Sequence, residues 1–276
     1  MRSLRRRLRS FASAYGVDLG KVRHSIAGRG AYRRNRREFA RLREDPALTN
    51  VFPMGAAWPC FADRFDGGGV AGGHYFHQDL LVAQWIFAAN PVRHIDVGSR
   101  LDGFAAHVAS FREVEVLDIR ANQTSATGLK FHQRDIMVAD PAWDDCCDSL
   151  SCLHTIEHFG LGRYGDALDP DGWKVGWRNL VRMVRQGGVI YLSTMIGRQR
   201  IEFDAHRVFA VPTVLALVAD TCEVESVALV GDLGELHLDL DHTGPAAARS
   251  FDCEAGCLIL RLRRRETSAS RPPSGS

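Results

Sequence analysis

The chain has 276 residues, of which 45% are hydrophobic and 25% are charged, and its net charge is +2. This is the composition of a globular protein that can bury one sizeable core. No apolar run approaches the roughly 20 residues of a membrane-spanning helix, and the start lacks the apolar core of a secretory signal, so we expect neither. The seven cysteines show no paired metal spacing, which favours a reduced, cytoplasmic protein.

The amino-terminal segment is strongly basic. Residues 1–45 hold 14 Lys or Arg against 4 Asp or Glu, a net charge of +10, and residues 46–276 therefore carry −8. We expect residues 1–50 to form a basic helical extension. It is either a solvated helical face or a contact for an anionic partner, such as lipid headgroups at the inner membrane face. Nucleic acid is not expected, because the segment lacks interleaved aromatic residues.

Helices and strands alternate along the rest of the chain. In chain order the pattern predicts a helix over 77–89, a strand over 92–97, a helix over 101–111, strands over 113–118, 130–135 and 147–153, a helix over 173–184, a strand over 189–195, a helix over 211–219, and strands over 223–230 and 257–262. This order predicts an α/β fold with a mostly parallel, doubly wound sheet, and the last two strands predict an antiparallel edge pair. We place this domain at residues 51–265, followed by a disordered Ser/Pro-rich tail over 266–276.

Acidic residues end the first three predicted strands: Asp96, Asp118 and Asp135. In an open α/β sheet, ligands bind beyond the carboxyl ends of the strands, so these carboxylates should lie at one site. Asp118 follows Asp96 by 22 residues, which places it to accept hydrogen bonds from ribose hydroxyls. The sequence therefore predicts a ligand that contains a nucleoside.

The turn after the first strand discriminates between nucleoside ligands. It reads DVGSRLDG (96–103) and lacks the G-x-G-x-x-G of dinucleotide sites, and Asp96 would repel a pyrophosphate. The D-x-G order resembles the first motif of class I S-adenosylmethionine-dependent methyltransferases, whose loop holds a cationic sulfonium. This resemblance covers residues 90–264 and implies a Rossmann-like methyltransferase fold with S-adenosylmethionine as the cofactor. The implied cofactor-binding residues are Asp96, Gly98, Ser99, Arg100, Asp118, Ile119, Asp135, Ile136 and His154.

The loop departs from the methyltransferase pattern D-x-G-x-G-x-G at two positions. Arg100 and Asp102 stand where the second and third glycines would be. Arg100 can clamp the methionine carboxylate of the cofactor, or it can pair with Asp102 and hold the loop rigid.

Four longer blocks resemble a narrower group. GHYFHQDL (73–80), HIDVGSRLDGFAAHVASFR (94–112), DSLSCLHTIEHFGLGRYGDALDP (148–170) and IGRQRIEFDAHRVF (196–209) look like the signature blocks of a mainly bacterial, methyltransferase-like family of unassigned function. Such proteins accompany surface-polysaccharide or glycosyl-transfer enzymes. The resemblance implies a hydroxyl-bearing acceptor, such as a saccharide or a surface-glycan precursor.

The run His154-x-x-Glu157-His158 is an inverted zinc-protease signature. A zinc site of that kind needs both histidines on one helix face, but His154 is expected at the end of a strand. We therefore expect no bound metal, and a metal-dependent hydrolase using His154 and His158 is an alternative. In the favoured interpretation His154 lies beneath the methyl donor, while Glu157 and His158 face the acceptor. In the structural alternative, Glu157 or His158 caps the next segment.

The remaining candidates bind or activate the acceptor. Arg163, Tyr164 and Asp166 lie in a Gly-rich loop and suit a hydroxyl-rich ligand, or else they belong to an ordinary surface loop. His206 and Arg207 follow the fifth parallel strand, where Arg207 can bind substrate and His206 is either a base or a structural histidine. His74 and His77 are expected to pack as part of a lid.

The predicted reaction is methyl transfer from S-adenosylmethionine to a hydroxyl, with His158, Glu157 and His206 as catalytic candidates. The alternative from another class is a non-catalytic protein that binds a nucleotide or glycan on the same fold. We expect the protein in the cytoplasm, with peripheral contact to the inner membrane face if the basic extension binds lipid.

Overall fold

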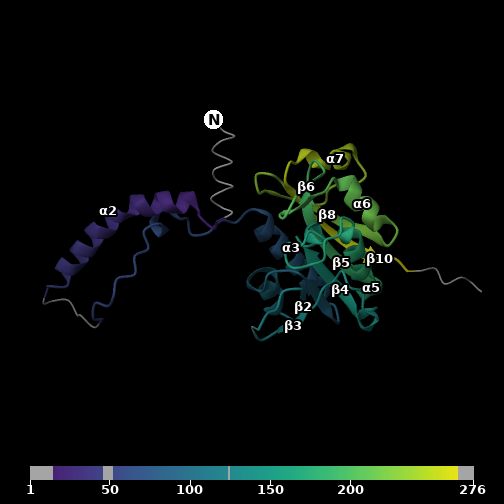
Figure 1. Cartoon of the computed structure of the whole chain (residues 1–276), viewed down its shortest axis with the longest axis horizontal. Coiled ribbons are helices and arrows are strands. Elements are labelled where there is room, and N and C mark those ends of the chain that lie inside the picture. The colour runs from purple at the N-terminus through teal and green to yellow at the C-terminus, as the bar shows by residue number, and fades with distance from the viewer. Residues whose placement is uncertain (1–14, 46–51, 124, 267–276) are drawn as a thin grey trace, which may run out of the picture. The chain divides into compact units, whose positions relative to one another are not determined.

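The computed structural model describes residues 15–45, 52–123 and 125–266, which fold as two compact units divided between Val70 and Ala71 (Figure 1). The sequence placed the start of the second domain at residue 51, whereas the division lies further along the chain. The first 14 residues of the basic extension and tail residues 267–276 are outside the described residues.

The first unit contains one long helix, α2 (Leu19–Leu42), which begins at Asp18. The Asp18 carboxylate accepts hydrogen bonds from the backbone N–H groups of Gly20 and Lys21, at 2.7 and 3.0 Å, and so caps the helix. The segment ending in the short turn η1 (Asp63–Phe65) packs on α2, and a Cβ at Gly28 would lie 1.9 Å from the Phe61 carbonyl oxygen. Glycine is therefore required at this contact.

Helix α2 is strongly basic. The helix holds eight Lys or Arg residues and a single acid, Glu38, and all eight basic residues are exposed. Glu38 is paired with Arg41, so most of the positive charge has no acidic neighbour on the helix.

The second unit is built on an eight-stranded sheet in the order β3-β2-β1-β4-β5-β10-β8-β9. Its strands are β1 (His94–Val97), β2 (Val114–Asp118), β3 (Leu129–Gln133), β4 (Cys147–Leu153), β5 (Val184–Ile196), β8 (Cys222–Val230), β9 (Leu236–His237) and β10 (Gly256–Arg264). Strands β1 to β5 pair in parallel, whereas β10 is antiparallel to both β5 and β8. The predicted fold class is confirmed. However, β10 lies inside the sheet, and the antiparallel strand at the edge is the short β9.

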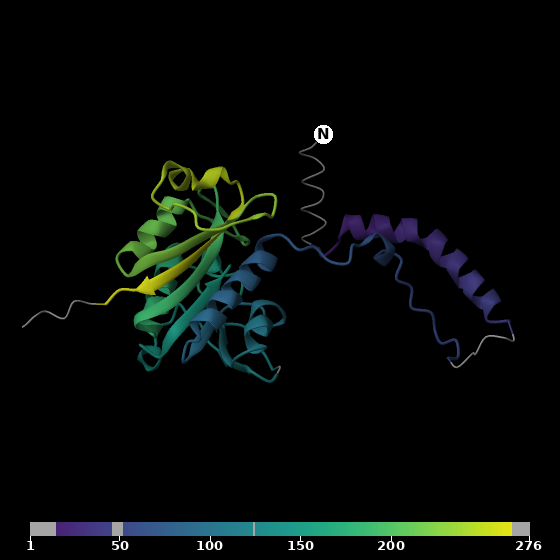
Figure 2. The ribbon, with the colours of Figure 1, turned by 180° about the vertical axis from the view of Figure 1, so that it is seen from behind.

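Helices cover both faces of the sheet (Figure 2). They are α3 (His74–Ala89), α4 (Ala106–Ala109), α5 (Gly172–Met183), α6 (Val211–Ala219) and α7 (Pro245–Ala248). Apolar side chains of α3 and α4, such as Ile86 and Val108, pack with Tyr191 and Ile259 of the sheet. Residues of α5 and α6, such as Leu180, form a second cluster on the other face. Because neighbours along a strand point to opposite faces, Cys257 lies on the same face as Ile259, toward α3.

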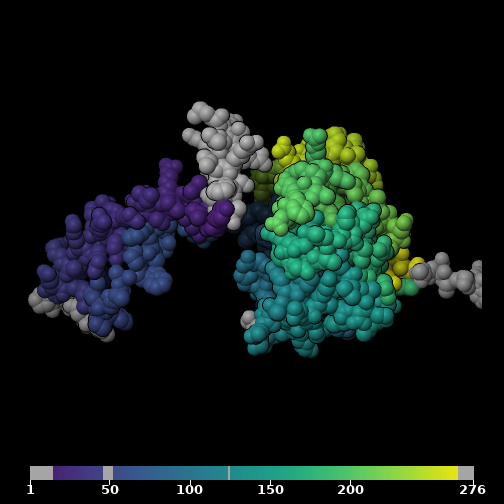
Figure 3. All heavy atoms as spheres, viewed as in Figure 1, coloured from purple at the N-terminus to yellow at the C-terminus, as the bar shows by residue number. Residues whose placement is uncertain are grey.

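Short turns connect these elements: η2 (Leu101–Ala105), η3 (Pro141–Trp143), η4 (Ile156–His158) and η5 (Ser250–Asp252). A small hairpin that the sequence did not predict, β6 (Arg200–Glu202) with β7 (His206–Val208), follows β5. In the space-filling view the second unit is one packed body, with the green and yellow part after β5 beside the teal part that carries β2 to β4 (Figure 3). Within the described part of the chain, no helix combines the length and apolar character needed to cross a bilayer.

Candidate functional site

The turn after β1 packs directly on the turn after β4. Gly98 has a φ of 79°, and a Cβ there would lie 2.4 Å from the methyl group of the Thr155 side chain. Both its backbone conformation and the close approach of Thr155 require glycine. The glycine of the D-x-G motif thus allows the two turns to meet at the edge of the sheet.

A buried polar network holds the β1 turn from beneath. The Asp96 carboxylate accepts hydrogen bonds from the Ser151 hydroxyl at 2.5 Å and from the Ser99 hydroxyl at 2.9 Å. Burial raises the pKa of Asp96 to about 7, although the serine hydrogen bonds oppose this shift. Asp96 is fully buried and lines neither of the two pockets described next, so the structure places it beneath the turn and not at the predicted contact with the cofactor. Its hydrogen bonds fix the turn that would carry the ligand.

Two adjoining pockets lie beyond the carboxyl ends of β1, β2, β3 and β4. The residues that line both are Gly98, Asp118, Arg120, His154, His158 and Tyr164. The first pocket extends to Ile119, Asp135 and Ile136. The second extends along the β1 turn, past Ser99 and Arg100.

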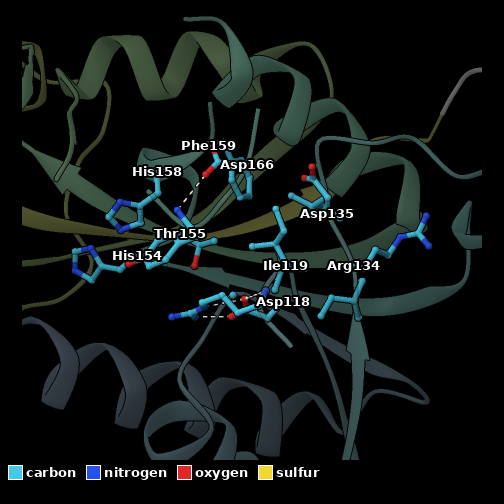
Figure 4. Close-up of a pocket in the computed structure, with 15 residues that line it drawn as sticks. Asp118, Ile119, Arg134, Asp135, His154, Thr155, His158, Phe159 and Asp166 are labelled. Carbon is cyan, nitrogen blue, oxygen red and sulfur yellow. Dashed lines mark hydrogen bonds and ion pairs between the residues drawn. The ribbon is translucent and has the colours of Figure 1, made fainter. Parts of the chain in front are cut away.

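Figure 4 shows His154 and His158 at one end of the first pocket, Arg134 and Asp135 at the other, and Asp118 between them. The structure therefore brings together the predicted cofactor-binding residues other than Asp96, as one continuous hollow.

Asp118 is held by a residue that the sequence analysis missed. Arg120 donates two hydrogen bonds to the Asp118 carboxylate, Nε to Oδ1 at 2.9 Å and Nη2 to Oδ2 at 2.5 Å. The Arg120 guanidinium also lies 4.6 Å from the centre of the Tyr164 ring. Arg120 thus links the end of β2 to the loop after β4, and it occupies the carboxylate expected to bind ribose.

Arg100 adopts the second of its two predicted arrangements. Its Nε and Nη2 donate to the two carboxylate oxygens of Asp102 at 2.9 and 2.7 Å, and both side chains are largely exposed. The pair lines the second pocket.

Glu157 supports His154 from within the core. His154 has a φ of 49°, which residues with a side chain rarely adopt, and its Nδ1 donates to Glu157 Oε1 at 2.7 Å. Burial alone would raise the pKa of Glu157, but its hydrogen bond with His154 outweighs burial and lowers it. Glu157 is 1% exposed and lines neither pocket, so the prediction that it faces the acceptor is wrong. Its carboxylate instead orients the His154 ring.

His158 is the histidine best placed to exchange a proton in the pocket. Its Nδ1 donates to the Ala205 carbonyl oxygen at 2.7 Å, which leaves a lone pair on Nε2, and the side chain lines both pockets. Burial lowers the pKa of His158 below its usual value of 6.5. The other predicted base, His206, has its ring 6.4 Å from that of His158 and its Nε2 3.5 Å from Glu202, and it lines neither pocket.

Arg207 is a structural residue. It is 5% exposed, and its guanidinium donates to four backbone carbonyls, those of Glu157, Phe159, Asp169 and Pro170. It lines neither pocket, so its predicted contact with substrate is wrong. These carbonyls belong to both ends of the loop after β4, so Arg207 ties the two ends of that loop together.

The predicted acceptor residues of that loop do reach the pockets. Arg163 lines the second pocket and donates to the Ala205 carbonyl at 2.9 Å, and Tyr164 lines both pockets. Asp166 lines the first pocket, and its carboxylate also accepts from the backbone N–H of Gly160 at 2.8 Å.

A third group lies behind His154. Within residues 15–45, 52–123 and 125–266, one set of His, Cys, Asp or Glu side chains could hold a metal ion, and its members are His74, His154 and Cys257. The His74 and His154 rings stack with centroids 5.3 Å apart, and Tyr75 also packs on His154. His158 is not in the set, so the two histidines of the inverted zinc signature do not meet here.

The sequence analysis missed further pocket residues. Tyr75, Gln78 and Asp79 of α3 line the second pocket, and Arg134 lines the first. Burial raises the pKa of Asp79, which carries its carboxylate next to Gly103. The polar residues Gln78 and Asp79, next to the apolar run of α3, were the one local signal for this wall.

Several solved structures resemble the second unit. The (4+2)-cyclase SpnF is 16% identical over 77% of this chain and 85% of that chain, with a TM-score of 0.50. A 1,6-didemethyltoxoflavin-N1-methyltransferase from Burkholderia thailandensis, solved with 1,6-didemethyltoxoflavin and S-adenosylhomocysteine, is 14% identical over 68% of this chain and 79% of that chain, with a TM-score of 0.48. The N-methyltransferase NodS from Bradyrhizobium japonicum WM9, solved with S-adenosylhomocysteine, is 12% identical over 70% and 89%, with a TM-score of 0.47.

At these identities the likeness to SpnF shows the fold alone, and the strand order agrees with it: a Rossmann-like α/β fold. No functionally curated protein matches the sequence. Residues 108–261 match the family described as "Caenorhabditis protein of unknown function, DUF268", and the chain belongs to that family. The description does not support the bacterial origin that the sequence blocks suggested.

Proposed function

We propose that this protein is an S-adenosylmethionine-dependent methyltransferase that acts on a hydroxyl-bearing acceptor. The observation that carries the proposal is the continuous hollow that runs from Gly98, past Asp118, to Ile136. An adenosyl ligand needs such a hollow, because its amino-acid, ribose and adenine parts lie in one line.

The cofactor would be bound by residues at the ends of β2 and β3 and by a residue of α3. Asp118 would accept hydrogen bonds from the ribose hydroxyls after Arg120 moves away from its carboxylate. Ile119, Asp135 and Ile136 would surround the adenine. Asp79, close to Gly103, supplies negative charge for the ammonium of the methionine part. When bound, the cofactor supplies an electrophilic methyl group on sulfur.

His158 would act as the base. Because its Nδ1 proton is committed to the Ala205 carbonyl, Nε2 can accept the proton that the acceptor hydroxyl loses as its oxygen bonds to the methyl carbon and the carbon–sulfur bond breaks. A positioned base of this kind accelerates a reaction by roughly 10²–10⁴-fold. Holding the two reactants in line supplies the larger part of the acceleration.

A hydroxyl-rich acceptor, such as a saccharide or surface-glycan precursor, suits the wall formed by Arg163 and Tyr164. An aromatic face beside a forked donor can bind a sugar ring and its hydroxyl groups. The Arg163 guanidinium is 5.2 Å from the centre of the Tyr164 ring, so the two side chains form one surface.

A second candidate function is binding without turnover. The Asp118–Arg120 pair favours it, because this pair must open before ribose can bind. Calorimetric titration with S-adenosylmethionine and S-adenosylhomocysteine tests both candidates. Failure to bind any adenosyl compound would reject the methyltransferase proposal. Binding without release of S-adenosylhomocysteine, when candidate glycan acceptors are added, would favour the binding protein.

For the first unit we propose peripheral contact with an anionic membrane. The support is the set of eight exposed basic residues on α2, since each basic residue near anionic headgroups contributes about 1 kcal/mol. Such contact would place the protein at the inner membrane face.

A further inference from the structure

We propose that His74, His154 and Cys257 form a binding site for one zinc ion beside the candidate cofactor pocket. The three side chains come from the start of α3, the turn after β4 and the start of β10. One ligand atom from each lies within 4.8 Å of the other two. Chain segments far apart in sequence thus place two imidazoles and one thiol around a single point.

His154 shows an arrangement typical of a metal ligand. Its Nδ1 donates to Glu157 Oε1 at 2.7 Å, so its Nε2 is the atom left to accept. That Nε2 is buried without a hydrogen-bond partner, and the His154 side chain is 5% exposed. Histidines that bind metals commonly donate their other ring N–H to a carboxylate, which fixes the tautomer and directs the free nitrogen at the ion. This nitrogen is therefore available to a ligand at the edge of the pocket.

The other two side chains complete a suitable donor set. His74 is partly buried and its ring stacks on the His154 ring with centroids 5.3 Å apart, so its imidazole lies within reach of the same point. Cys257 is fully buried, and its Sγ has weak contacts, 3.8 Å to Gln78 Oε1 and 3.9 Å to the Leu258 carbonyl oxygen. Two imidazole nitrogens and one thiolate are ligands that zinc prefers.

The geometry is close to what zinc requires. With zinc–nitrogen bonds of about 2.0 Å and a zinc–sulfur bond of about 2.3 Å, two nitrogens and one sulfur in a tetrahedral site lie about 3.3–3.5 Å apart. The observed limit of 4.8 Å therefore asks for movements of at most about 1.5 Å. His74 can supply them by rotating, because it is the partly exposed first residue of α3.

The set leaves one tetrahedral position for another ligand. Three protein ligands with an open fourth position are typical of catalytic zinc sites. His154 and Gln78 both line the second pocket, so the open position would be reached from there. The site differs from the one suggested by His154-x-x-Glu157-His158. His158 is hydrogen-bonded to the Ala205 carbonyl, and Glu157 accepts a hydrogen bond from the Nδ1 of His154. The site also runs against the expectation from sequence that no metal is bound.

The test uses the full chain, stripped with a chelator and titrated with Zn²⁺ in competition with a chromophoric chelator, and with Co²⁺ followed by absorption spectroscopy. We expect one ion per chain, with a thiolate-to-cobalt charge-transfer band and the ligand-field intensity of a tetrahedral site. His74→Ala and Cys257→Ser should each weaken Zn²⁺ binding at least 100-fold, and Cys257→Ser should abolish the charge-transfer band. His77→Ala, one turn along α3, and Cys253→Ser, four residues before Cys257, are the matched controls and should bind as the wild type does.

Three outcomes would overturn the proposal. The first is a wild-type protein that binds Zn²⁺ with a dissociation constant weaker than micromolar, and the second is a Zn²⁺ affinity that both His74→Ala and Cys257→Ser leave unchanged. The third outcome is a cobalt spectrum without the thiolate charge-transfer band. Thermal unfolding of each stripped variant reports its fold. If Cys257→Ser does not fold, His74→Ala decides the case, because His74 is partly exposed. None of these measurements involves an adenosyl compound, so they stand apart from the proposed function.

Discussion

If the ribose hydroxyls displace Arg120 from Asp118, substitutions of these two residues should have opposite effects on cofactor binding. If Asp118 binds the ribose hydroxyls, Asp118→Ala removes charge-assisted hydrogen bonds worth about 1–3 kcal/mol. The dissociation constant for S-adenosylhomocysteine should then rise by about 5- to 150-fold. The Asp118 side chain is 10% exposed, so little water is available to replace it as the acceptor.

Arg120→Ala should have the opposite effect and strengthen the binding of S-adenosylhomocysteine. In the free protein Arg120 holds the same carboxylate, but its own side chain is 48% exposed, so the ion pair is worth at most about 1 kcal/mol. Removing this competitor should tighten binding by up to about fivefold. The double variant should bind as weakly as Asp118→Ala alone, since there is then no carboxylate to release.

Isothermal titration calorimetry measures all three variants, with Glu113→Ala as the control. Glu113 is an acid paired with Lys130 on the surface and lines neither pocket, so its loss should leave affinity unchanged. Wild-type affinity in a folded Asp118→Ala variant would remove Asp118 from the ligand site. Weaker binding by Arg120→Ala would show that Arg120 contacts the ligand and does not compete with it.

Three further predictions concern catalysis, loop stability and the basic helix. His158→Gln should slow methyl transfer by roughly 10²–10⁴-fold with little change in cofactor affinity. Because the pKa of His158 is lowered, its neutral, proton-accepting form persists below pH 6.5, so the wild-type rate should fall only at more acidic pH, and an acid limb above pH 6.5 would contradict this role. Arg207→Met leaves buried carbonyls without donors and should lower the free energy of unfolding by about 1–3 kcal/mol in urea titrations, and an unchanged midpoint would refute the structural role. A chain that starts at residue 46 should lose co-sedimentation with anionic vesicles at low salt, whereas equal sedimentation of both chains would leave α2 as a solvated face.

Local sequence patterns were sufficient for much of the fold. Strand β4 and helix α6 have the residue limits that the pattern predicted, and α6 is an apolar run. The position of β10 inside the sheet was missed, because the partner of a strand depends on contacts that its own residues do not encode. The β6–β7 hairpin was missed because its strands are three residues long and mostly polar.

The site was predictable to the extent that it follows from strand ends. Asp118 and Asp135 were found because the carboxyl ends of parallel strands share one edge of the sheet. Arg207 and Glu157 were misassigned, since polar residues beside a site look the same in sequence whether they face the ligand or the core. Cys257 was not singled out as a site residue, because only the fold brings it to His74 and His154.

The place of β10 between β5 and β8 also constrains how the chain can fold during synthesis. β8 leaves the ribosome before β10. In the folded sheet β8 does not pair with β5, because β10 lies between them and pairs with both. Until residues 256–264 emerge, β5 presents an unpaired edge with apolar residues such as Tyr191 and Leu192. Such an edge is a template for pairing with other chains. Chains whose synthesis stops before β10 should therefore aggregate readily and bind chaperones.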